Sequence, residues 1–246
     1  MPTTDIIFYQ EEDGIVPIVD WLDGLPDKAR VKCLARLGRL EELGHEIRRP
    51  EADLLRDGIY ELRIGLQGIN YRVLYFFHRK EAAVVSHGLT KERRVPPGEI
   101  DQAIERKKKK KERRSSKPTL SSTRFDRSSS NRSNRTMGRK SRFASKALEF
   151  AYDRYVGNDK AKAKAFEAEL ANADVARKLY DLRTKAGLTQ SGLAKLVGTS
   201  TSVISRLEDA EYEGHSLAML RRVASAFDKR VEIRFVSVKR AASSAS

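Results

Sequence analysis

The sequence predicts an α+β fold: an N-terminal small antiparallel sheet with helices, a disordered basic linker, and a C-terminal all-α domain with a terminal β-strand. Three observations support this. Three β-rich runs follow one another between residues 58 and 89, and a serine-rich stretch at 107–142 holds most of the positive charge. Near the C-terminus, two short helix patterns are separated by a tight turn. A chain of 246 residues has room for two small domains.

Residues 1–112 form the first predicted domain. A strand is expected at 6–10, a short helix at 17–26, and a long amphipathic helix over Asp27–Leu43. The runs GIYELRIGL, NYRVLYFF and AAVVSHGL are separated by glycine, asparagine and charged residues, which predicts an antiparallel meander. Proline then opens a further helix from residue 96. One small core is enough for these elements.

The net charge of +15 is concentrated in one stretch. Residues 1–106 carry 16 Lys and Arg against 19 Asp and Glu, whereas residues 107–142 carry 15 against 2. This stretch has almost no apolar residues and cannot bury enough surface to offset the entropy of ordering. We therefore predict a disordered linker over 113–142, either as a plain spacer or as a segment loosely attracted to nucleic-acid phosphates.

Residues 143–246 form the second predicted domain, and its core at 177–236 has the pattern of a helix-turn-helix. Thr189 is a natural N-cap for a helix over 190–197, and Gly198 supplies the tight turn that ends it. Ser200 caps the next helix, from Thr201 to Asp209. A second helix placed in this way enters the DNA major groove with its N-terminal residues at the base edges.

These residues resemble the Cro/C1-type repressors, including HigA-like antitoxins. The resemblance rests on Gln190, Ala194, Gly198, Ile204 and the Arg206-Leu207-Glu208 run. It implies that the second helix reads DNA and that Gln190 reaches a phosphate. The implied DNA-binding set is Gln190, Ser200, Thr201, Ser202, Ser205 and Arg206. A helical bundle without a DNA role is the alternative.

Two segments of this domain leave alternatives open. Residues 143–183 carry more amphipathic helix than a minimal helix-turn-helix needs, which fits an extended repressor core or a helical arm that docks on another protein surface. We favour the arm. The terminal RVEIRFVSV alternates like a strand and either pairs between protomers or caps its own domain.

Cations are expected to converge on one region of the N-terminal sheet. Arg63 and Arg72 lie on consecutive predicted strands, and Lys91 follows the third. Fixed cations in this arrangement suit a polyanion, because arginine can bind a phosphate through two hydrogen bonds. The alternative is salt bridging with Glu61 or other acids on adjacent strands.

The segments YELRIGLQGINYRVLYFF and HGLTKERRVPPGEIDQAIERK resemble the RelE/HigB toxin superfamily, in its phage-related Gp49-like branch. This resemblance implies a RelE-like fold and a metal-independent endoribonuclease, an mRNA interferase that cuts mRNA on the ribosome. Arg63 and Arg72 would then hold the scissile phosphate, and Lys91 would act as a base. His87 and Tyr75 are candidates for proton transfer or base stacking.

A HigB-like domain followed by a HigA-like domain suggests a fused type II toxin–antitoxin protein that represses its own promoter. The expected partners are operator DNA, mRNA on the ribosome, and the toxin–antitoxin contact itself, within one chain or across a homodimer. No cofactor is expected, since no paired Cys or His ligands and no nucleotide-binding glycine loop occur. The absence of a secretory signal and of long apolar runs suggests a cytoplasmic protein with no membrane partner. The alternative function is a transcriptional regulator whose N-terminal domain has lost catalysis.

Overall fold

The computed structural model describes residues 3–79, 82–91, 94–115, 142–210 and 212–234. Its N-terminal part is built on a five-stranded sheet with the order β1-β5-β4-β3-β2. These strands are β1 (Asp5–Phe8), β2 (Ala52–Leu54), β3 (Ile59–Leu66), β4 (Ile69–His78) and β5 (Ala82–Lys91). The predicted meander is confirmed, because β3, β4 and β5 pair antiparallel in turn. β1 lies parallel to β5 at the sheet edge, so the sheet is antiparallel except for this edge strand.

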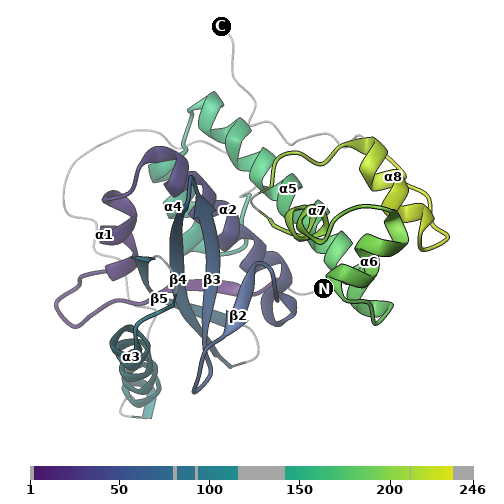
Figure 1. Cartoon of the computed structure of the whole chain (residues 1–246). Coiled ribbons are helices and arrows are strands. Elements are labelled where there is room, and N and C mark those ends of the chain that lie inside the picture. Colours follow the sequence, from purple (N-terminus) through teal and green to yellow (C-terminus); the bar gives the residue numbers. More distant parts are fainter. Residues whose placement is uncertain (1–2, 80–81, 92–93, 116–141, 211, 235–246) are drawn as a thin grey trace, which may run out of the picture.

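Helices cover both faces of the sheet (Figure 1). α1 (Pro17–Asp23), α2 (Asp27–Leu43) and the short 3-10 turn η1 (Gly44–Glu46) lie toward one face, and α3 (Pro97–Ser115) lies on the other. Leu62 and Val73 pack in the cluster with α2, whereas Ile59 and Phe76 pack in the cluster with α3. The central strands are therefore buried on both faces where these helices cover them.

α3 extends beyond the predicted domain boundary. Residues 113–115, which the sequence assigns to the linker, continue this helix to Ser115. The remaining predicted linker residues up to 141 lie outside the described part of the chain. The lysine run at 107–111 therefore belongs to a helix and not to an irregular spacer.

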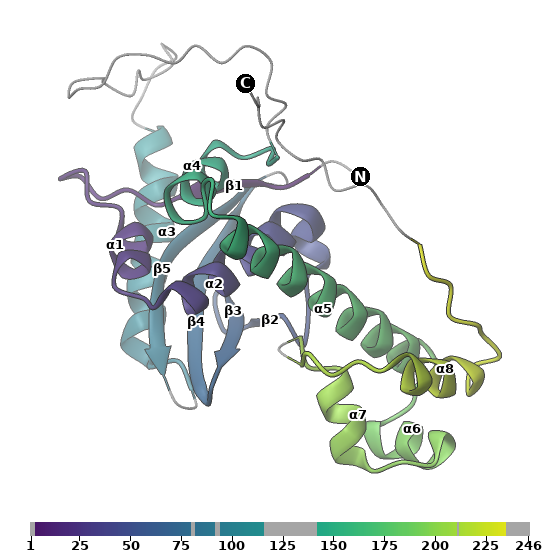
Figure 2. The same cartoon turned by 90° about the horizontal axis from the view of Figure 1, so that it is seen from above.

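Two helices after the linker pack back onto the N-terminal part (Figure 2). These are α4 (Lys146–Tyr155) and α5 (Lys160–Lys185), which we call the arm together with residues 142–145. Phe143, Leu148 and Phe166 belong to the same buried cluster as Leu34 and Leu37 of α2. This is the contact that the arm interpretation anticipates, made within a single chain.

The arm also completes the outer edge of the sheet. The Ser145 hydroxyl accepts a hydrogen bond from the backbone N–H of Ile6 at 2.7 Å and donates to the Glu41 carboxylate at 2.5 Å. The backbone N–H of Ser145 donates to the same carboxylate at 2.8 Å. An edge strand leaves backbone groups without a ladder partner. Ser145 satisfies one of them on β1, so the arm is an integral part of the N-terminal fold.

The C-terminal lobe contains α6 (Gln190–Val197), α7 (Thr201–Leu207) and α8 (Leu217–Ser225). The predicted caps are confirmed: Thr189 accepts from the Gly192 N–H at 3.0 Å, and Gly198 is left-handed with φ 70° and ψ 48°. The far end of α5 enters this lobe, where Leu179 packs with α6, α7 and α8. The terminal strand is not seen in the described part of its predicted span, residues 230–234, and the rest of that span lies outside the described residues.

Gly88 of β5 is required by the aromatic ring of Trp21. A Cβ at this position would lie 2.1 Å from the Trp21 ring, closer than any side-chain contact allows. We expect Gly88→Ala to lower the free energy of unfolding by about 3 kcal/mol, in the upper range for overpacked cores. Urea unfolding of the full chain measures this. Gly98→Ala is the control, because nothing lies near its added methyl group, and equal effects of the two variants would contradict the account.

Candidate functional site

The two predicted arginines face each other across neighbouring strands. Arg63 of β3 pairs directly with Arg72 of β4 in the antiparallel register. The carboxylate of Glu61 lies between them, with one oxygen 2.7 Å from Arg63 Nε and the other 3.2 Å from Arg72 Nε. The Arg63 side chain is 35% exposed and the Arg72 side chain 12%, so solvent reaches the pair mainly from the Arg63 side. We call Glu61, Arg63 and Arg72 the arginine cluster.

Acidic neighbours neutralise part of this charge. Arg63 Nη2 also lies 2.9 Å from Asp53 of β2, which in turn pairs with Arg49. Burial acts to raise the pKa of the Asp53 carboxyl, but the hydrogen bond from Arg49 and the charges of Arg63 and Arg49 outweigh it and hold the pKa below 3.8. The ion pairs that the sequence offers as an alternative are therefore present. They hold the arginine head groups in a fixed arrangement beside the outermost strand.

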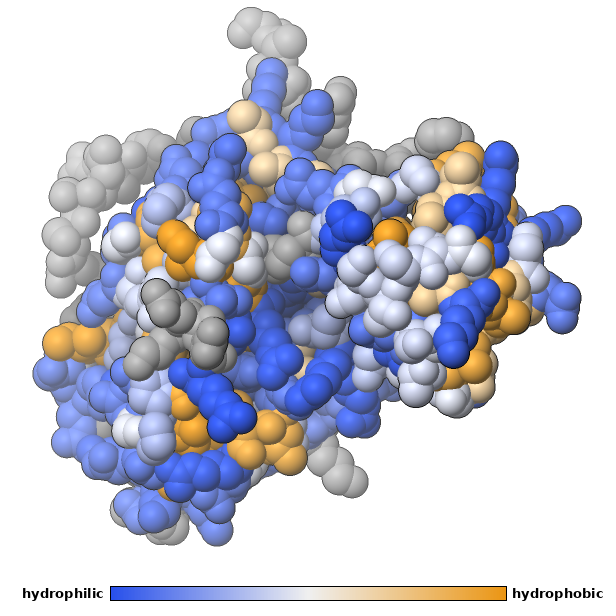
Figure 3. All heavy atoms as spheres, in the orientation of Figure 1, coloured by the Kyte–Doolittle hydropathy of each residue, from blue (hydrophilic) through white to orange (hydrophobic). Residues whose placement is uncertain are grey.

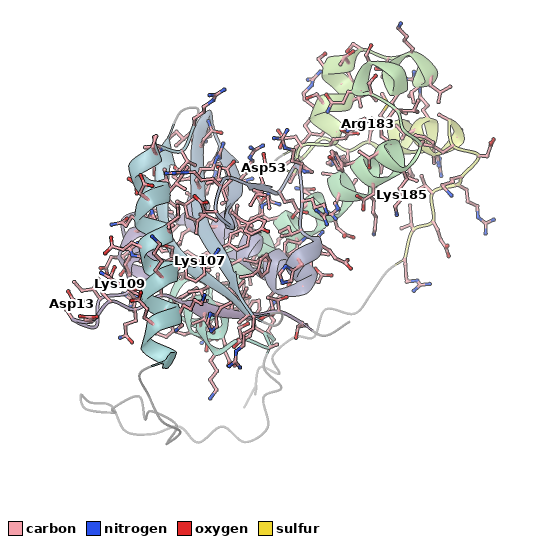
Figure 4. The ribbon with its side chains drawn as sticks, turned by 90° about the horizontal axis from the view of Figure 1, so that it is seen from below. Asp13, Asp53, Lys107, Lys109, Arg183 and Lys185 are labelled. Atoms are coloured by element: carbon pink, nitrogen blue, oxygen red, sulfur yellow. The ribbon has the colours of Figure 1, made fainter. Side chains whose placement is uncertain are left out.

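This cluster lies on the face of the sheet that α3 partly covers. Asp53 marks the sheet edge that is nearest to the helix-turn-helix lobe (Figure 4). In the space-filling view of Figure 3, the surface between the sheet and this lobe is hollowed and mostly hydrophilic. Such a surface suits a polar or charged partner better than an apolar one.

His87 lies on the same face but inside a closed network. Its Nδ1 is 2.9 Å from Arg106 Nη1 and 2.8 Å from the Ser86 hydroxyl, and its Nε2 is 3.0 Å from the Glu99 carboxylate. Because guanidinium only donates, Nδ1 must accept and Nε2 must carry the proton. The residue is only 5% exposed. His87 therefore orients Glu99 and α3, and direct contact with a substrate would require α3 to move.

The neutral state of His87 makes stability depend on pH. Burial, followed by the charge of Arg106, lowers its pKa below 6.5 despite the opposing carboxylates of Glu99 and Glu11. The unfolded chain then takes up the proton first. The stabilisation is complete above about pH 6.5 and is lost as the pH falls through this value toward the lower folded pKa.

We expect the free energy of unfolding to decrease between about pH 7.5 and about pH 5.5, and His87→Gln to weaken that decrease. Urea unfolding at the two pH values measures it. His45→Gln is the control variant, because His45 lies away from the His87 network. Its ring stacks on Phe77, which packs against the apolar cluster on the α2 face of the sheet. An unchanged pH dependence in the His87 variant would refute the assignment.

Tyr75 does not join the arginine cluster, which corrects one expectation. It is completely buried in the cluster packed under α2, with its ring stacked on Tyr60 at 5.4 Å. Burial raises the pKa of its phenol well above 10.0. Neither proton transfer nor base stacking at the arginine cluster is compatible with this position on the opposite face.

Lys91 is the last residue of β5 and pairs with Asn70 of β4. Arg72 pairs with Leu89, two residues earlier on the same strand. The backbone register thus brings Lys91 to the row next to the two arginines. Its proposed role as a base stays a prediction.

The predicted DNA-reading residues form one exposed surface at the start of α7. Thr201, Ser202, Ser205 and Arg206 are all exposed. Ser200 accepts from the Val203 N–H at 3.4 Å as the N-cap, and its hydroxyl lies 2.9 Å from that of Ser202. Arg206 is the one cation in this set and the strongest base reader among them.

Gln190 has a different partner from the one expected. Its amide donates to the Glu208 carboxylate at 3.0 Å, which turns it toward the lobe and not toward a phosphate. Glu208 also binds Arg183 of α5 at 2.6 Å and 2.9 Å, and both residues are buried. This pair fixes α7 against α5. No role is predicted from the sequence for the Arg183–Glu208 pair. Its signal is detectable, because both charged residues occupy positions at which the helical spacing predicts an apolar side chain.

Replacing Arg206 with alanine is expected to lower the affinity for specific DNA about 30-fold, since a bidentate base contact contributes about 1–3 kcal/mol of discrimination. Fluorescence anisotropy on a duplex selected from a random DNA pool measures this. Arg221→Ala removes an equally exposed arginine from α8 and should change the affinity little. Equal losses would show that Arg206 contributes only charge.

Two chemical features are absent from the described residues. No group of three or more His, Cys, Asp or Glu side chains that could hold a metal ion occurs among them. In the same part of the chain, no helix is both long and apolar enough to cross a membrane.

Comparison with protein families matches the two ends of the chain separately. Residues 20–108 match the family described as phage derived protein Gp49-like (DUF891), and residues 174–228 match a helix-turn-helix domain. A search of curated proteins gave no match. The first match runs from within α1 to within α3 and includes the arginine cluster, and the second includes the predicted DNA-reading surface of α7. The chain therefore joins a Gp49-like region to a helix-turn-helix DNA-binding region, a combination that supports a toxin–antitoxin-like regulator.

Proposed function

We propose that this chain is a fused type II toxin–antitoxin protein. Its N-terminal domain is a HigB-like mRNA endoribonuclease that acts on the ribosome, and its C-terminal part is a HigA-like antitoxin that represses its own promoter. The observation that carries the proposal is the arginine cluster on a Gp49-like sheet, joined to an exposed helix-turn-helix surface.

The arginine cluster offers the groups that RNA cleavage by the ribose 2′-hydroxyl requires. Arg63 and Arg72 bind the scissile phosphate and stabilise the charge that develops on it. Glu61, which already touches both arginines, accepts the 2′-hydroxyl proton. The 2′-oxygen–phosphorus bond forms while the phosphorus–5′-oxygen bond breaks, which gives a 2′,3′-cyclic phosphate and a 5′-hydroxyl. In this scheme Lys91 acts as the acid that protonates the leaving oxygen, in place of the base role that the resemblance implied.

The arm does not need to occupy the arginine cluster in order to inhibit the N-terminal domain. The arm packs on α2 and β1, whereas the arginine cluster lies on the face of the sheet shared with α3. The helix-turn-helix lobe, however, lies beside β2, the edge strand next to Arg63 (Figures 1 and 2). We infer that the lobe excludes a partner as large as the ribosome while the arm holds the lobe in place.

The arm connects the two activities through one continuous helix. Lys32 and Arg39 of α2 pair with Glu169 and Asp174 of α5 at 2.9 Å and 3.4 Å. Nine residues after Asp174, Arg183 binds Glu208 behind the DNA-reading helix. α5 contains neither glycine nor proline. A docked arm therefore fixes the direction in which α7 presents itself to DNA.

The alternative is a transcriptional regulator whose N-terminal domain only makes protein contacts. The pairing of Arg63 and Arg72 with Asp53 and Glu61 favours it, because such ion pairs also occur at purely structural sites. Growth of cells that express residues 1–178, which keep the part of the arm that packs on α2 but lose the lobe, distinguishes the two functions. An interferase arrests growth and loses this effect with Arg72→Ala, whereas a contact domain arrests growth in neither form.

A further inference from the structure

The second half of α3 is a cationic ridge that lies largely beyond the region matched by the Gp49-like family. That match ends at residue 108, whereas α3 continues to Ser115. Residues 107–115, KKKKKERRS, contain no apolar side chain. We call the exposed lysines Lys108, Lys109 and Lys111 the α3 ridge.

The first half of the helix anchors the ridge on the sheet. Ile100 and Ala103 are buried, and Arg106 binds Glu11 of the N-terminal segment at 2.7 Å. Lys107 donates to the backbone carbonyl of Asp57 at 2.7 Å. The lysines that follow are thus carried on a helix whose position and rotation are fixed by these contacts.

The acidic residues beside the α3 ridge balance only part of its positive charge. The segment from residue 105 to 112 has six Lys and Arg against two Asp and Glu, and Lys109 pairs with Glu105 at 2.9 Å. Like charges three or four positions apart on a helix each cost a few tenths of a kcal/mol, on the order of 0.3. A polyanion that binds along the ridge removes this repulsion and releases its own counterions.

The structure favours RNA over the other polyanions. A membrane-binding helix needs an apolar face beside its cations, and residues 107–115 offer none. Duplex DNA is read by α7, and Figure 4 shows Lys107 and Lys109 at the opposite end of the molecule from Arg183 and Lys185 of that lobe. α3 instead shares its face of the sheet with the arginine cluster, and Glu99 of α3 binds His87 of β5 on that face.

We propose that the α3 ridge binds the phosphate backbone of the RNA that the N-terminal domain acts on. The proposal rests on the proposed function only in taking RNA as the substrate. Each lysine acts as a point charge against one phosphate, so the ridge contributes affinity and salt dependence without base preference.

The test is binding of a fluorescein-labelled 20-nucleotide single-stranded RNA over a series of salt concentrations. The parent is the full chain with Arg72→Ala, which prevents cleavage during the titration. Lys108→Gln, Lys109→Gln and Lys111→Gln together should make the slope of log K against log salt less negative by about 2, since each single-strand contact contributes about 0.7. The matched control replaces Lys160, Lys164 and Lys178 of α5, also exposed, with glutamine.

The control variant should change the slope by less than the contribution of one phosphate contact, about 0.7. Equal changes in the two triple variants overturn the proposal, because they would show only a general charge effect. The proposal is also overturned if the ridge variant loses binding to a 20-base-pair non-operator duplex or to phosphatidylserine vesicles but not to RNA. Cleavage is scored separately in residues 1–178 with Arg72 intact, so a missing ribonuclease and a missing ridge give different results.

Discussion

Replacing Arg72 with alanine should lower mRNA cleavage by residues 1–178 at least 100-fold, which corresponds to about 2.7 kcal/mol of lost transition-state stabilisation. Arg72 is held at the centre of the arginine cluster by Glu61 and donates to the backbone carbonyl of Tyr71 at 2.9 Å. It is mostly buried, so its charge acts in a region where water screens poorly. Cleavage rates on translated reporter mRNA measure the effect.

Two further variants separate charge from geometry. Arg72→Lys keeps the charge but cannot bind a phosphate through two parallel hydrogen bonds, so we expect partial activity. Arg56→Ala removes an arginine that pairs with Asp101 of α3, outside the arginine cluster, and should leave cleavage unchanged. If Arg56→Ala is as damaging as Arg72→Ala while both proteins are folded, the arginine cluster is not the catalytic site.

Phe166→Ala should lower the free energy of unfolding of the full chain by about 3–5 kcal/mol. Phe166 of α5 is completely buried between α2 and the rest of the arm, with the rings of Phe143 and Tyr152 at 6.1 Å and 5.2 Å. Gly38 of α2 lies beneath it, and a Cβ there would stand 3.6 Å from its ring. Removing the ring leaves a cavity at the centre of the arm contact. Urea unfolding measures the loss.

Phe150→Ala is the matched control, because this phenylalanine lies on α4 of the same arm but is 51% exposed. Its substitution should cost less than about 1 kcal/mol. The Phe166 variant should also bring RNA cleavage into the full chain, since a loosened arm no longer holds the lobe beside β2. Equal free energies of unfolding for the two variants would contradict the prediction, because they would show that the arm contributes little to the N-terminal fold.

Local signals predicted much of this fold. The spacing of apolar residues gives the observed bounds of α2, Asp27–Leu43, and the caps Thr189, Gly198 and Ser200 delimit α6 and the start of α7. Contacts between distant segments were not predictable in the same way. The hydrogen bonds of Ser145 with Ile6 and Glu41 span more than 100 residues, and no local pattern encodes them.

The same distinction between local signals and long-range contacts applies to the candidate site. Strand alternation places Arg63 and Arg72 side by side as expected. Tyr75 is three residues after Arg72, and in a strand an odd separation sends side chains to opposite faces. That reasoning could have excluded Tyr75 from the sequence alone. The salt bridges of Glu61 with the two arginines were also predictable, as the alternative to phosphate binding. The burial of His87 by Arg106 depends on tertiary packing, which the sequence does not reveal.

The most direct test of the fused toxin–antitoxin proposal is primer extension on a reporter mRNA in a translating extract. Residues 1–178, the same fragment with Arg72→Ala, and the full chain are compared. The fragment keeps the N-terminal core, since its buried residues end at Phe166. We predict codon-positioned cuts from the fragment, none from its Arg72 variant, and suppressed cuts from the full chain. A folded fragment that makes no cuts, or cuts that persist without Arg72, would contradict the proposal.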